Sequence, residues 1–182
     1  RRAALDGAWR AEQSAAAQAR LAAVPAFAAA RVVALYAALP GEVDLAALIE
    51  AVQDEGRQVC LPAFDPRRGG YAMTYVSQTT AYGEAAFGLQ EPLAPQWADP
   101  ADLQCVVAPG VAFDTQGHRV GHGGGHYDRM LAGLAGVKIG VGFDFQLRDA
   151  VPTEPHDITM DIVVTPSRTV SIAPATGGAS AL

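Results

Sequence analysis

The sequence contains a group of residues that suits the binding of an anion. Four glycines occupy the five positions 121–125, and Arg119 and Arg129 flank them. A glycine cluster lets the backbone adopt positive φ and approach a ligand closely, so that its N–H groups can point at a phosphate. An apolar run at 103–108 predicts a buried strand before this loop, and apolar side chains at helical spacing predict a helix at 127–134 after it. Strand, glycine loop and helix in this order are typical of a phosphate-binding segment.

The loop matches neither of the two common phosphate-binding motifs. The pattern GxxxxGK[ST] is absent, and Lys138 is the only lysine in the sequence, which excludes a Walker-type lysine. A dinucleotide-binding loop would need a third glycine where His126 stands. A plain surface turn is the alternative, but Tyr127, Asp128 and Arg129 follow the glycines directly and favour a binding site. The residues therefore predict an anion-binding loop of unassigned type.

Three histidines recur every four residues in the same segment, at positions 118, 122 and 126. On a helix they would share one face and could ligate zinc, but the glycines between them argue against a helix there. The fourth histidine, His156, stands beside Asp157 and could act as an oriented base. A structural hydrogen bond is the simpler role for His156.

Three carboxylates stand at the ends of predicted elements. Asp128 follows the glycine loop and Asp161 precedes the last predicted strand. Two carboxylates near bound phosphate suggest Mg²⁺, which prefers oxygen ligands. For Asp128 an acid in the first turn of a helix is an equal alternative, and Glu42, after the first predicted strand, is by itself typical of such an acid.

The predicted elements alternate between strand and helix, which indicates a parallel sheet with helices on its faces. We predict helices at 1–23, 26–30 and 42–55, strands at 31–39, 58–61, 71–76 (a candidate edge strand), 103–108, 137–143 and 162–165, and irregular segments at 62–70 and 88–100. The fold class is thus α/β, a single-domain open, mostly parallel sheet with helices on both faces in a Rossmann-like, three-layer arrangement. We expect the domain to span 1–170 and a flexible tail to follow at 171–182. Ligands of such sheets lie beyond the carboxyl ends of the strands.

The composition limits the class of protein and its partners. A chain of 182 residues, half of them hydrophobic and 18% charged, suits one globular domain. The net charge of −6 argues against nucleic acid or an anionic membrane as a partner. No membrane-spanning run or secretory signal is visible, so we expect a cytoplasmic location. Cys60 and Cys105 each lie in a strand-like run and are expected to be small buried hydrophobic residues.

Six segments of the chain form a set of motifs in a fixed order. They are Glu42-Val43-Asp44, Pro109-Gly110-x-x-Phe113-Asp114, Arg119-x-Gly121-x-Gly123-x-Gly125-x-Tyr127-Asp128-Arg129, Gly142-Phe143-Asp144-x-Gln146, Val151-Pro152-x-Glu154-x-His156-Asp157 and Met160-Asp161-x-Val163-Val164-Thr165. In sequence and order these motifs resemble those of the 5-formyltetrahydrofolate cyclo-ligase (methenyltetrahydrofolate synthetase) family, and the matches run from about residue 36 to 166.

The resemblance implies the roles of particular residues. It implies Arg119 and Tyr127 in catalysis and Asp128 and Asp161 as magnesium ligands. It implies an ATP site formed by Arg2, Arg119, Gly121, Gly123, Gly124, Gly125, His126, Tyr127 and Arg129. It implies a folate site formed by Glu42, His122, Gly123, Gly124, Gly125 and His126, in which the carboxylate of Glu42 pairs with the N–H donors of the pterin.

The activity that the resemblance implies is the ATP- and Mg²⁺-dependent cyclisation of 5-formyltetrahydrofolate to 5,10-methenyltetrahydrofolate, with release of ADP and phosphate. Phosphoryl transfer of this kind needs mainly positioning and charge neutralisation. Its partners are small molecules, with no nucleic acid and no membrane, and we expect a monomer. Two alternatives stay open. One is a non-catalytic folate- or nucleotide-binding relative, because Asp6, His122 and His126 depart from the family pattern. The other is a sugar-phosphate or coenzyme A enzyme on a similar sheet.

Overall fold

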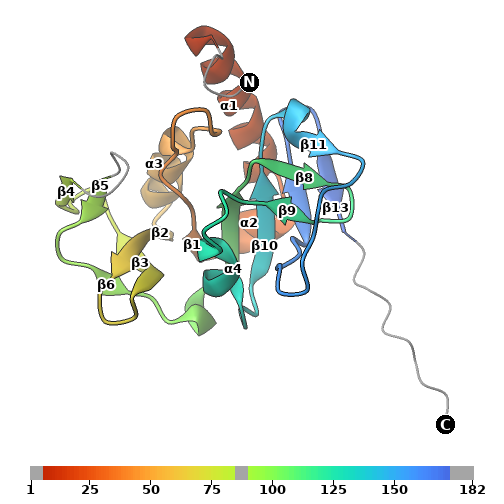
Figure 1. Cartoon of the computed structure of the whole chain (residues 1–182). Helices are drawn as coiled ribbons and strands as arrows, with labels where there is room; N and C mark the ends of the chain where they lie inside the picture. Colours follow the sequence, from red (N-terminus) through yellow and green to blue (C-terminus); the bar gives the residue numbers. More distant parts are fainter. Residues whose placement is uncertain (1–5, 85–89, 173–182) are drawn as a thin grey trace.

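In a computed structural model, residues 6–84 and 90–172 are described, and their main element is an eight-stranded sheet of order β13-β12-β10-β7-β1-β2-β3-β6 (Figure 1). Its parallel centre comprises β12 (Ile162–Val164), β10 (Val137–Val141), β7 (Cys105–Pro109), β1 (Val32–Ala34) and β2 (Gln58–Asp65). Antiparallel strands flank it, namely β13 (Thr169–Ser171), β3 (Gly70–Val76) and β6 (Gln96–Trp97). The predicted open, mostly parallel α/β sheet is confirmed.

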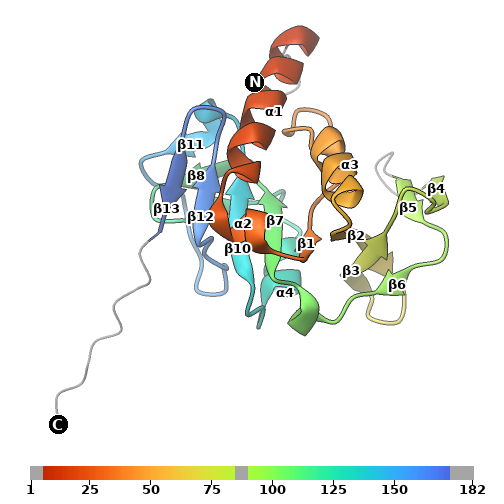
Figure 2. The ribbon, with the colours of Figure 1, turned by 180° about the vertical axis from the view of Figure 1, so that it is seen from behind.

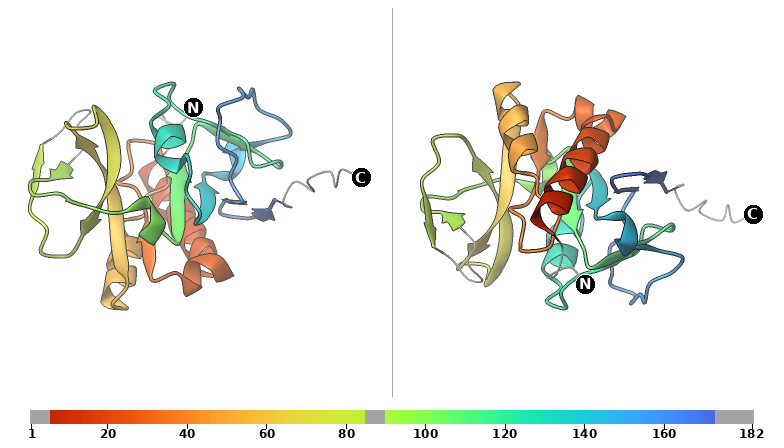
Figure 3. Two further views of the ribbon diagram at one scale, coloured as in Figure 1. Left: turned by 90° about the horizontal axis from the view of Figure 1, so that it is seen from below. Right: turned by 90° about the horizontal axis from the view of Figure 1, so that it is seen from above.

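Helices cover both faces of the sheet, as predicted. One face carries α1 (Gly7–Ala22), α2 (Pro25–Ala29) and α3 (Ala46–Asp54), which lie in front of the sheet in Figure 2. The other carries α4 (His126–Leu131) and a small second sheet, and Figure 3 shows the main sheet between these two layers. Alternate residues of a strand point to opposite faces. Accordingly Val107 packs on the α1–α3 side, whereas Val106 and Ala108 pack on the α4 side, and all three are at most 1% exposed.

The second sheet was not predicted from the sequence. In the described chain it has three strands, β8 (Ala112–Asp114), β9 (Arg119–Val120) and β11 (Leu147–Arg148), in the order β11-β8-β9. These strands are too short to show a periodic pattern. The segment between β7 and α4 is therefore a β-hairpin followed by the glycine loop, and the hairpin positions Arg119.

Several boundaries differ from the predictions for physical reasons. Strand β1 ends at Ala34, well short of residue 39, whereas β2 continues through Pro62 to Asp65. The carbonyl of Cys60 faces β1, where it accepts from the N–H of Leu35, so the backbone nitrogen of Pro62 faces the same side, beyond the end of β1. A proline is tolerated there because no neighbouring strand needs its N–H. The expected loop at 62–70 is thus a strand and a turn at 66–69.

Other corrections concern helix starts and the edges of the sheet. Helix α3 begins at Ala46, four residues after Glu42, and α1 begins after Asp6, whose carboxylate accepts from the N–H of Trp9 at 3.0 Å. Strand β3 is not an edge strand, since β6 pairs with it. The segment expected to be irregular contains β5 (Gln90–Pro92), which pairs with β4 (Tyr82–Glu84), and a 3₁₀ helix, η3 (Pro100–Asp102).

The carboxyl-terminal end of the domain also differs from the prediction. Strand β12 is followed by β13, which runs to Ser171, and the N–H of Ile172 donates to the backbone carbonyl of Asp161. The proposed tail at 171–182 therefore begins within an ordered strand, and its positions 173–182 lie outside the described residues. Among the described helices, none is long and apolar enough to cross a membrane.

Candidate active site

The glycine loop joins β9 to α4 beyond the carboxyl ends of the strands. The ring of His126, at the end of the loop, packs edge-on against Tyr71 with 5.0 Å between the ring centres. Tyr71 is the cross-strand partner of Phe64, which lies at the carboxyl end of β2, so the loop lies at that end of the sheet. Gly123 and Gly125 have φ of 88° and 59°, a backbone region that side chains with a Cβ rarely adopt. The predicted positive φ is therefore confirmed at two loop positions.

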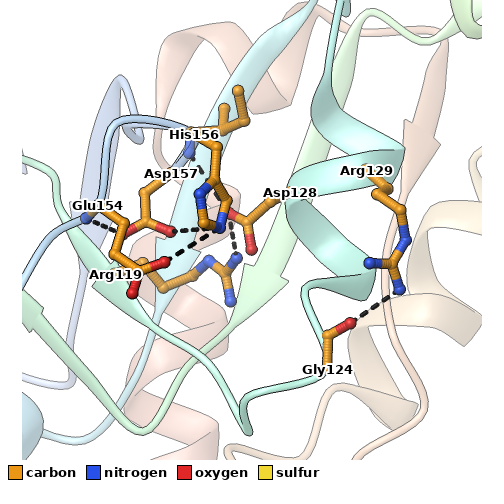
Figure 4. A network of polar contacts seen from close by, with 8 residues as sticks. Arg119, Gly124, Asp128, Arg129, Glu154, His156 and Asp157 are labelled. Atoms are coloured by element: carbon orange, nitrogen blue, oxygen red, sulfur yellow. Dashed lines mark hydrogen bonds and ion pairs between the residues drawn. The ribbon is translucent and has the colours of Figure 1, made fainter.

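Arg119 projects from β9 into the interior, next to the loop. It is 6% exposed, and its Nη2 donates to Oδ1 of Asp128 at 2.8 Å (Figure 4). Its guanidinium carbon lies 5.6 Å from the ring centre of Tyr127. The Nε of Arg119 is buried and finds no hydrogen-bond partner within the described part of the chain. A buried donor without a partner is costly, so this group is available to an anionic ligand.

Tyr127 lies beside Arg119, and the charge of Glu42 affects its phenol. Burial of its hydroxyl raises the pKa of Tyr127, and the negative charge of Glu42 raises it further, while the charge of Arg119 lowers it. Glu42 and Arg119 are therefore both close enough to influence the same phenol.

Glu42 lies in a turn between β1 and α3. It is 5% exposed, its Oε2 accepts from the N–H of Leu39 at 2.9 Å, and its own N–H donates to the carbonyl of Leu39 at 3.0 Å. The interpretation of Glu42 as a first-turn acid of a helix is wrong, because α3 begins at Ala46. A buried carboxylate held by its own turn is a preorganised acceptor for N–H donors.

Arg129 and His126 hold the far side of the loop. The Nη2 of Arg129 donates to the carbonyl of Gly124 at 2.8 Å and to Nδ1 of His126 at 3.0 Å. Figure 4 shows the side chain of Arg129 on the side of α4 away from Arg119. Arg129 therefore braces the loop from outside, and Arg119 lies on the inner side.

The three regularly spaced histidines do not gather. His118 Nδ1 lies 3.0 Å from Oδ2 of Asp114, His126 contacts Tyr71, and His122 is exposed. Within residues 6–84 and 90–172 no group of three or more His, Cys, Asp or Glu side chains could hold a metal ion. The spacing of four residues does not bring the histidines onto one face, because the segment is a hairpin and a loop and not a helix.

The two carboxylates that the resemblance pairs around magnesium have separate basic partners. Asp128 bonds to Arg119 and accepts from the N–H of Ile158 at 3.3 Å. Asp161 lies at the amino end of β12, where its Oδ2 accepts from the backbone N–H of Lys138 at 2.7 Å and from Lys138 Nζ at 3.0 Å. The structure thus places Asp128 beside the glycine loop and Asp161 at the opposite end of the strands. Arg2 lies outside the described residues.

Buried polar residues that were not assigned a role support the site. Asp114, 1% exposed, accepts from the N–H groups of Gln116, His118 and Val151 at 2.9–3.2 Å. Gln146, 3% exposed, donates to the carbonyl of Gly110 at 2.7 Å and accepts from the N–H of Phe143 at 2.8 Å. These two side chains tie the segments after β7 and β10 together, which fixes the hairpin that carries Arg119.

The segment 151–158 lies over Arg119 and Asp128. Figure 4 shows His156 beside these side chains, together with Glu154 and Asp157. Nε2 of His156 is 3.4 Å from Oε2 of Glu154 and 3.9 Å from Oδ1 of Asp157, and the imidazole is largely exposed. The structural hydrogen bond that we expected for His156 therefore stays a prediction.

The fold and the site together define an open-sheet α/β protein with a candidate anion site beyond the carboxyl ends of its strands. Over residues 1–166 the chain matches the model of the 5-formyltetrahydrofolate cyclo-ligase family. It is 33% identical to 5-formyltetrahydrofolate cyclo-ligase of Escherichia coli K12 over 92% of this chain and 96% of that protein. It is 34% identical to the Mycolicibacterium smegmatis protein of the same name, over 76% and 75% of the two chains.

Solved structures agree with this assignment. The NMR structure of Aquifex aeolicus 5,10-methenyltetrahydrofolate synthetase superimposes with a TM-score of 0.85 at 32% identity, covering 97% of this chain and 89% of that one. A Mycoplasma pneumoniae 5,10-methenyltetrahydrofolate synthetase, 21% identical, shares the fold with a TM-score of 0.70. The chain belongs to the 5-formyltetrahydrofolate cyclo-ligase family, as its motifs predicted.

Proposed function

We propose that this protein uses ATP to convert 5-formyltetrahydrofolate to 5,10-methenyltetrahydrofolate, releasing ADP and phosphate. One observation carries the proposal beyond family membership. A buried arginine with an unpartnered Nε lies beside a glycine loop with positive φ, and its guanidinium carbon is 5.6 Å from the ring centre of Tyr127. This arrangement suits the binding of the anionic phosphates of ATP.

The loop and Arg119 are assigned to the phosphates. The N–H groups of 121–125 bind phosphate oxygens, because an open stretch of glycines permits close approach. Arg119 neutralises charge on the transferred phosphoryl group, and Tyr127 lies under its guanidinium and limits its motion. Arg129 and His126 keep the loop in its binding conformation through the bonds to Gly124 and between themselves.

Glu42 is assigned to the pterin. Its buried carboxylate accepts hydrogen bonds from the ring N–H groups, which orients the formyl group toward the γ-phosphate. The formyl oxygen attacks phosphorus and ADP leaves. N10 then attacks the formyl carbon, the C–O bond to phosphate breaks, and the proton of N10 passes to solvent. The chain's contribution is positioning and electrostatics, and the scheme requires no nucleophilic side chain.

Magnesium fits part of the donor set. Mg²⁺ usually binds one or two carboxylates together with phosphate oxygens, and Asp128 beside the loop suits this role. Asp161 does not fit in the present arrangement, because its carboxylate is bonded to Lys138 at the other end of the strands. When bound with ATP, the ion would neutralise phosphate charge. We therefore assign Asp128 to the metal and not Asp161, which lies at the opposite end of the strands.

A coupled assay tests the activity. Purified protein with 5-formyltetrahydrofolate, ATP and Mg²⁺ is expected to yield methenyltetrahydrofolate and ADP in equal amounts. Binding of both ligands without product would instead identify a non-catalytic relative, and indifference to the folate would favour a sugar-phosphate or coenzyme A enzyme. A cytoplasmic location and a monomeric state belong to the same proposal, and cell fractionation and light scattering test them.

Glu42→Gln separates the two halves of the site. Losing the charge of a buried hydrogen-bonded partner costs about 2–5 kcal/mol, so folate affinity is expected to fall by that amount, as measured by calorimetry. Affinity for ATP is expected to change little, since Glu42 is not assigned to the phosphates. Equal folate affinity in the variant and the wild type would remove Glu42 from the site.

Arg119→Ala tests the other half. We expect a loss of ATP affinity of about 1.5–3 kcal/mol, the worth of a charge-assisted hydrogen bond. The matched control is Arg148→Ala, which removes an exposed arginine of β11 and is expected to leave ATP affinity unchanged. Similar affinities in the two variants would contradict the phosphate role of Arg119.

A further inference from the structure

A groove of about 480 Å³ runs along one edge of the main sheet, between helix α1 and strands β12 and β13. Figure 2 shows these elements side by side on the face that α1 covers, whereas α4, which follows the glycine loop, lies on the other face. The volume of the groove is within the range of small-molecule sites, about 300–1,000 Å³. The groove is therefore separate from the candidate active site.

Three alanines form the helix side of the groove. Ala16, Ala19 and Ala23 are three and four positions apart, so they share one side of α1 and its C-terminal end, and all three are exposed. Ala17 and Leu21 face the core instead and are fully buried. The side chains of the three groove alanines end at Cβ, which leaves room between α1 and the edge of the sheet. Longer side chains at these positions would fill that room.

Arg20 supplies the charge of the groove. Its Nε donates to the backbone carbonyl of Pro166 at 3.2 Å, and both residues line the groove, so this bond holds the guanidinium between α1 and the segment after β12. Within residues 6–84 and 90–172 the two Nη groups of Arg20 make no hydrogen bond and no ion pair. Among the lining residues, all of which the structure describes, no other side chain is charged. A guanidinium with open Nη groups suits a carboxylate, which it can bind through two parallel hydrogen bonds.

Two hydroxyl groups of β13 line the strand side of the groove. Thr169 and Ser171 are two positions apart, so their side chains point to the same face of the sheet. Val170 between them packs against the core on the α4 side, which places the hydroxyls on the α1 side. In the part of the chain that the structure describes, neither hydroxyl has a hydrogen-bond partner. One positive charge with two neutral donors matches a single negative charge, and this favours a carboxylate over a phosphate dianion.

The remaining lining is mainly apolar and includes Ile162 of β12 and Val24, which precedes α2. We propose that the groove binds an aliphatic monocarboxylate. Arg20 and the two hydroxyls hold the carboxylate, and the hydrocarbon part packs on the alanines and on the apolar residues beside them. The inference goes beyond the proposed function and does not depend on it, because the groove shares no residue with the candidate active site.

NMR titration of the isotope-labelled full chain with three probes tests the site. The probes are octanoate, which has a carboxylate and a hydrocarbon chain, 1-octanol, which lacks the charge, and acetate, which lacks the chain. We expect octanoate to shift the amide signals of Arg20, Thr169 and Ser171. The other two probes should bind about tenfold more weakly or less, because each lacks one of the two interactions. If octanoate shifts none of these signals, the proposal is wrong.

Arg20→Gln tests the charge. Octanoate affinity should fall about tenfold, whereas binding of 1-octanol should not change, because the alcohol has no carboxylate. The matched control is Arg10→Gln, which removes an arginine of α1 that does not line the groove and should leave octanoate binding unchanged. An equal loss for octanoate and 1-octanol would show that Arg20 only supports packing through its bond to Pro166, and its assignment to the carboxylate would fall.

Ala19→Leu tests the location. A leucine side chain would fill the groove, so octanoate and 1-octanol should both lose about tenfold or more in affinity, and the helix should tolerate leucine as a good helix former. The matched control is Ala15→Leu, the same change at an exposed position of α1 outside the groove. Melting curves confirm that both variants are folded. Equal octanoate affinity in the two variants would overturn the location. Loss of octanoate binding in Arg119→Ala would overturn it as well, by placing the carboxylate at the candidate phosphate site.

Discussion

Glycines are concentrated in two regions of this molecule for opposite physical reasons. In the first region they surround the fully buried ring of Phe113 in β8. A Cβ at Gly110 would lie 2.6 Å from Cζ of Phe113, and one at Gly140 would overlap its Cε1. In the second region, the glycine loop, a Cβ at Gly123 would meet no atom of the described chain within 4 Å, but the backbone has a φ of 88°.

The difference shows what each set of glycines does. Around Phe113 the missing side chain makes room for a ring that joins the small sheet to β10, so these glycines stabilise the scaffold. In the loop the surrounding space is open and the requirement is conformational, which is what a backbone that receives a ligand needs. Substitutions in the first region are therefore expected to act on stability, and those in the second on binding.

The largest effect is expected for Gly140→Ala. Overpacking a well-packed core typically costs 1–3 kcal/mol, and we expect a loss near the upper limit, about 3 kcal/mol in the free energy of unfolding. Gly142→Ala is the graded control, because its Cβ would lie 3.1 Å from Phe113, a contact that a small shift relieves. Denaturant unfolding measures both variants. Equal free energies of unfolding for Gly140→Ala and Gly142→Ala would show that close packing against Phe113 is not the reason for glycine at position 140.

Gly123→Val is expected to have its main effect on ATP binding. A valine at positive φ strains the backbone by about 1–2 kcal/mol, and its side chain would occupy the open side of the loop where the phosphates approach. ATP affinity, measured by calorimetry on the folded variant, should fall by at least tenfold, while the melting temperature falls less than in Gly140→Ala. A folded variant that binds ATP normally would show that the loop does not hold the phosphates.

A smaller effect is expected for Asp114→Asn, which belongs to the scaffold. Burial raises the pKa of Asp114, but the hydrogen bonds from the His118 side chain and from the N–H groups of His118, Gln116 and Val151 outweigh it, so the pKa is lowered overall. A lowered pKa in the folded state adds stability above the unfolded pKa, near 4, and this stability is lost as pH falls through the folded pKa. Asp114→Asn should therefore flatten the acid side of the stability curve. If the free energies of unfolding of the wild type and the variant fall in parallel as the pH is lowered from about 4 to the folded-state pKa of Asp114, this expectation is wrong.

The smallest effect is expected for the cysteines, which report on the core without changing it. Burial raises the pKa of Cys60 and of Cys105 to about 12, and both are 0% exposed. Native protein should resist alkylation, and labelling should accelerate in Gly140→Ala but not in Gly123→Val. Rapid labelling of the native wild type would show that the core opens more easily than its packing indicates.

The sequence by itself determined the family, the alternation of strands and helices, the glycine loop before a helix and the burial of both cysteines. These features depend on local periodicity and on motif residues close together in the chain. Tertiary structure decided the rest. Strands β8, β9 and β11 have two or three residues each and form because Asp114, Gln146 and Phe113 bind segments more than 25 residues apart. The ion pair of Asp161 with Lys138 followed from the register of β12 on β10, and that of Asp128 with Arg119 from the placement of α4 beside β9. The row formed by His126, Tyr71 and Phe64 joins three elements that share no sequence pattern, since only the folded chain brings their side chains together.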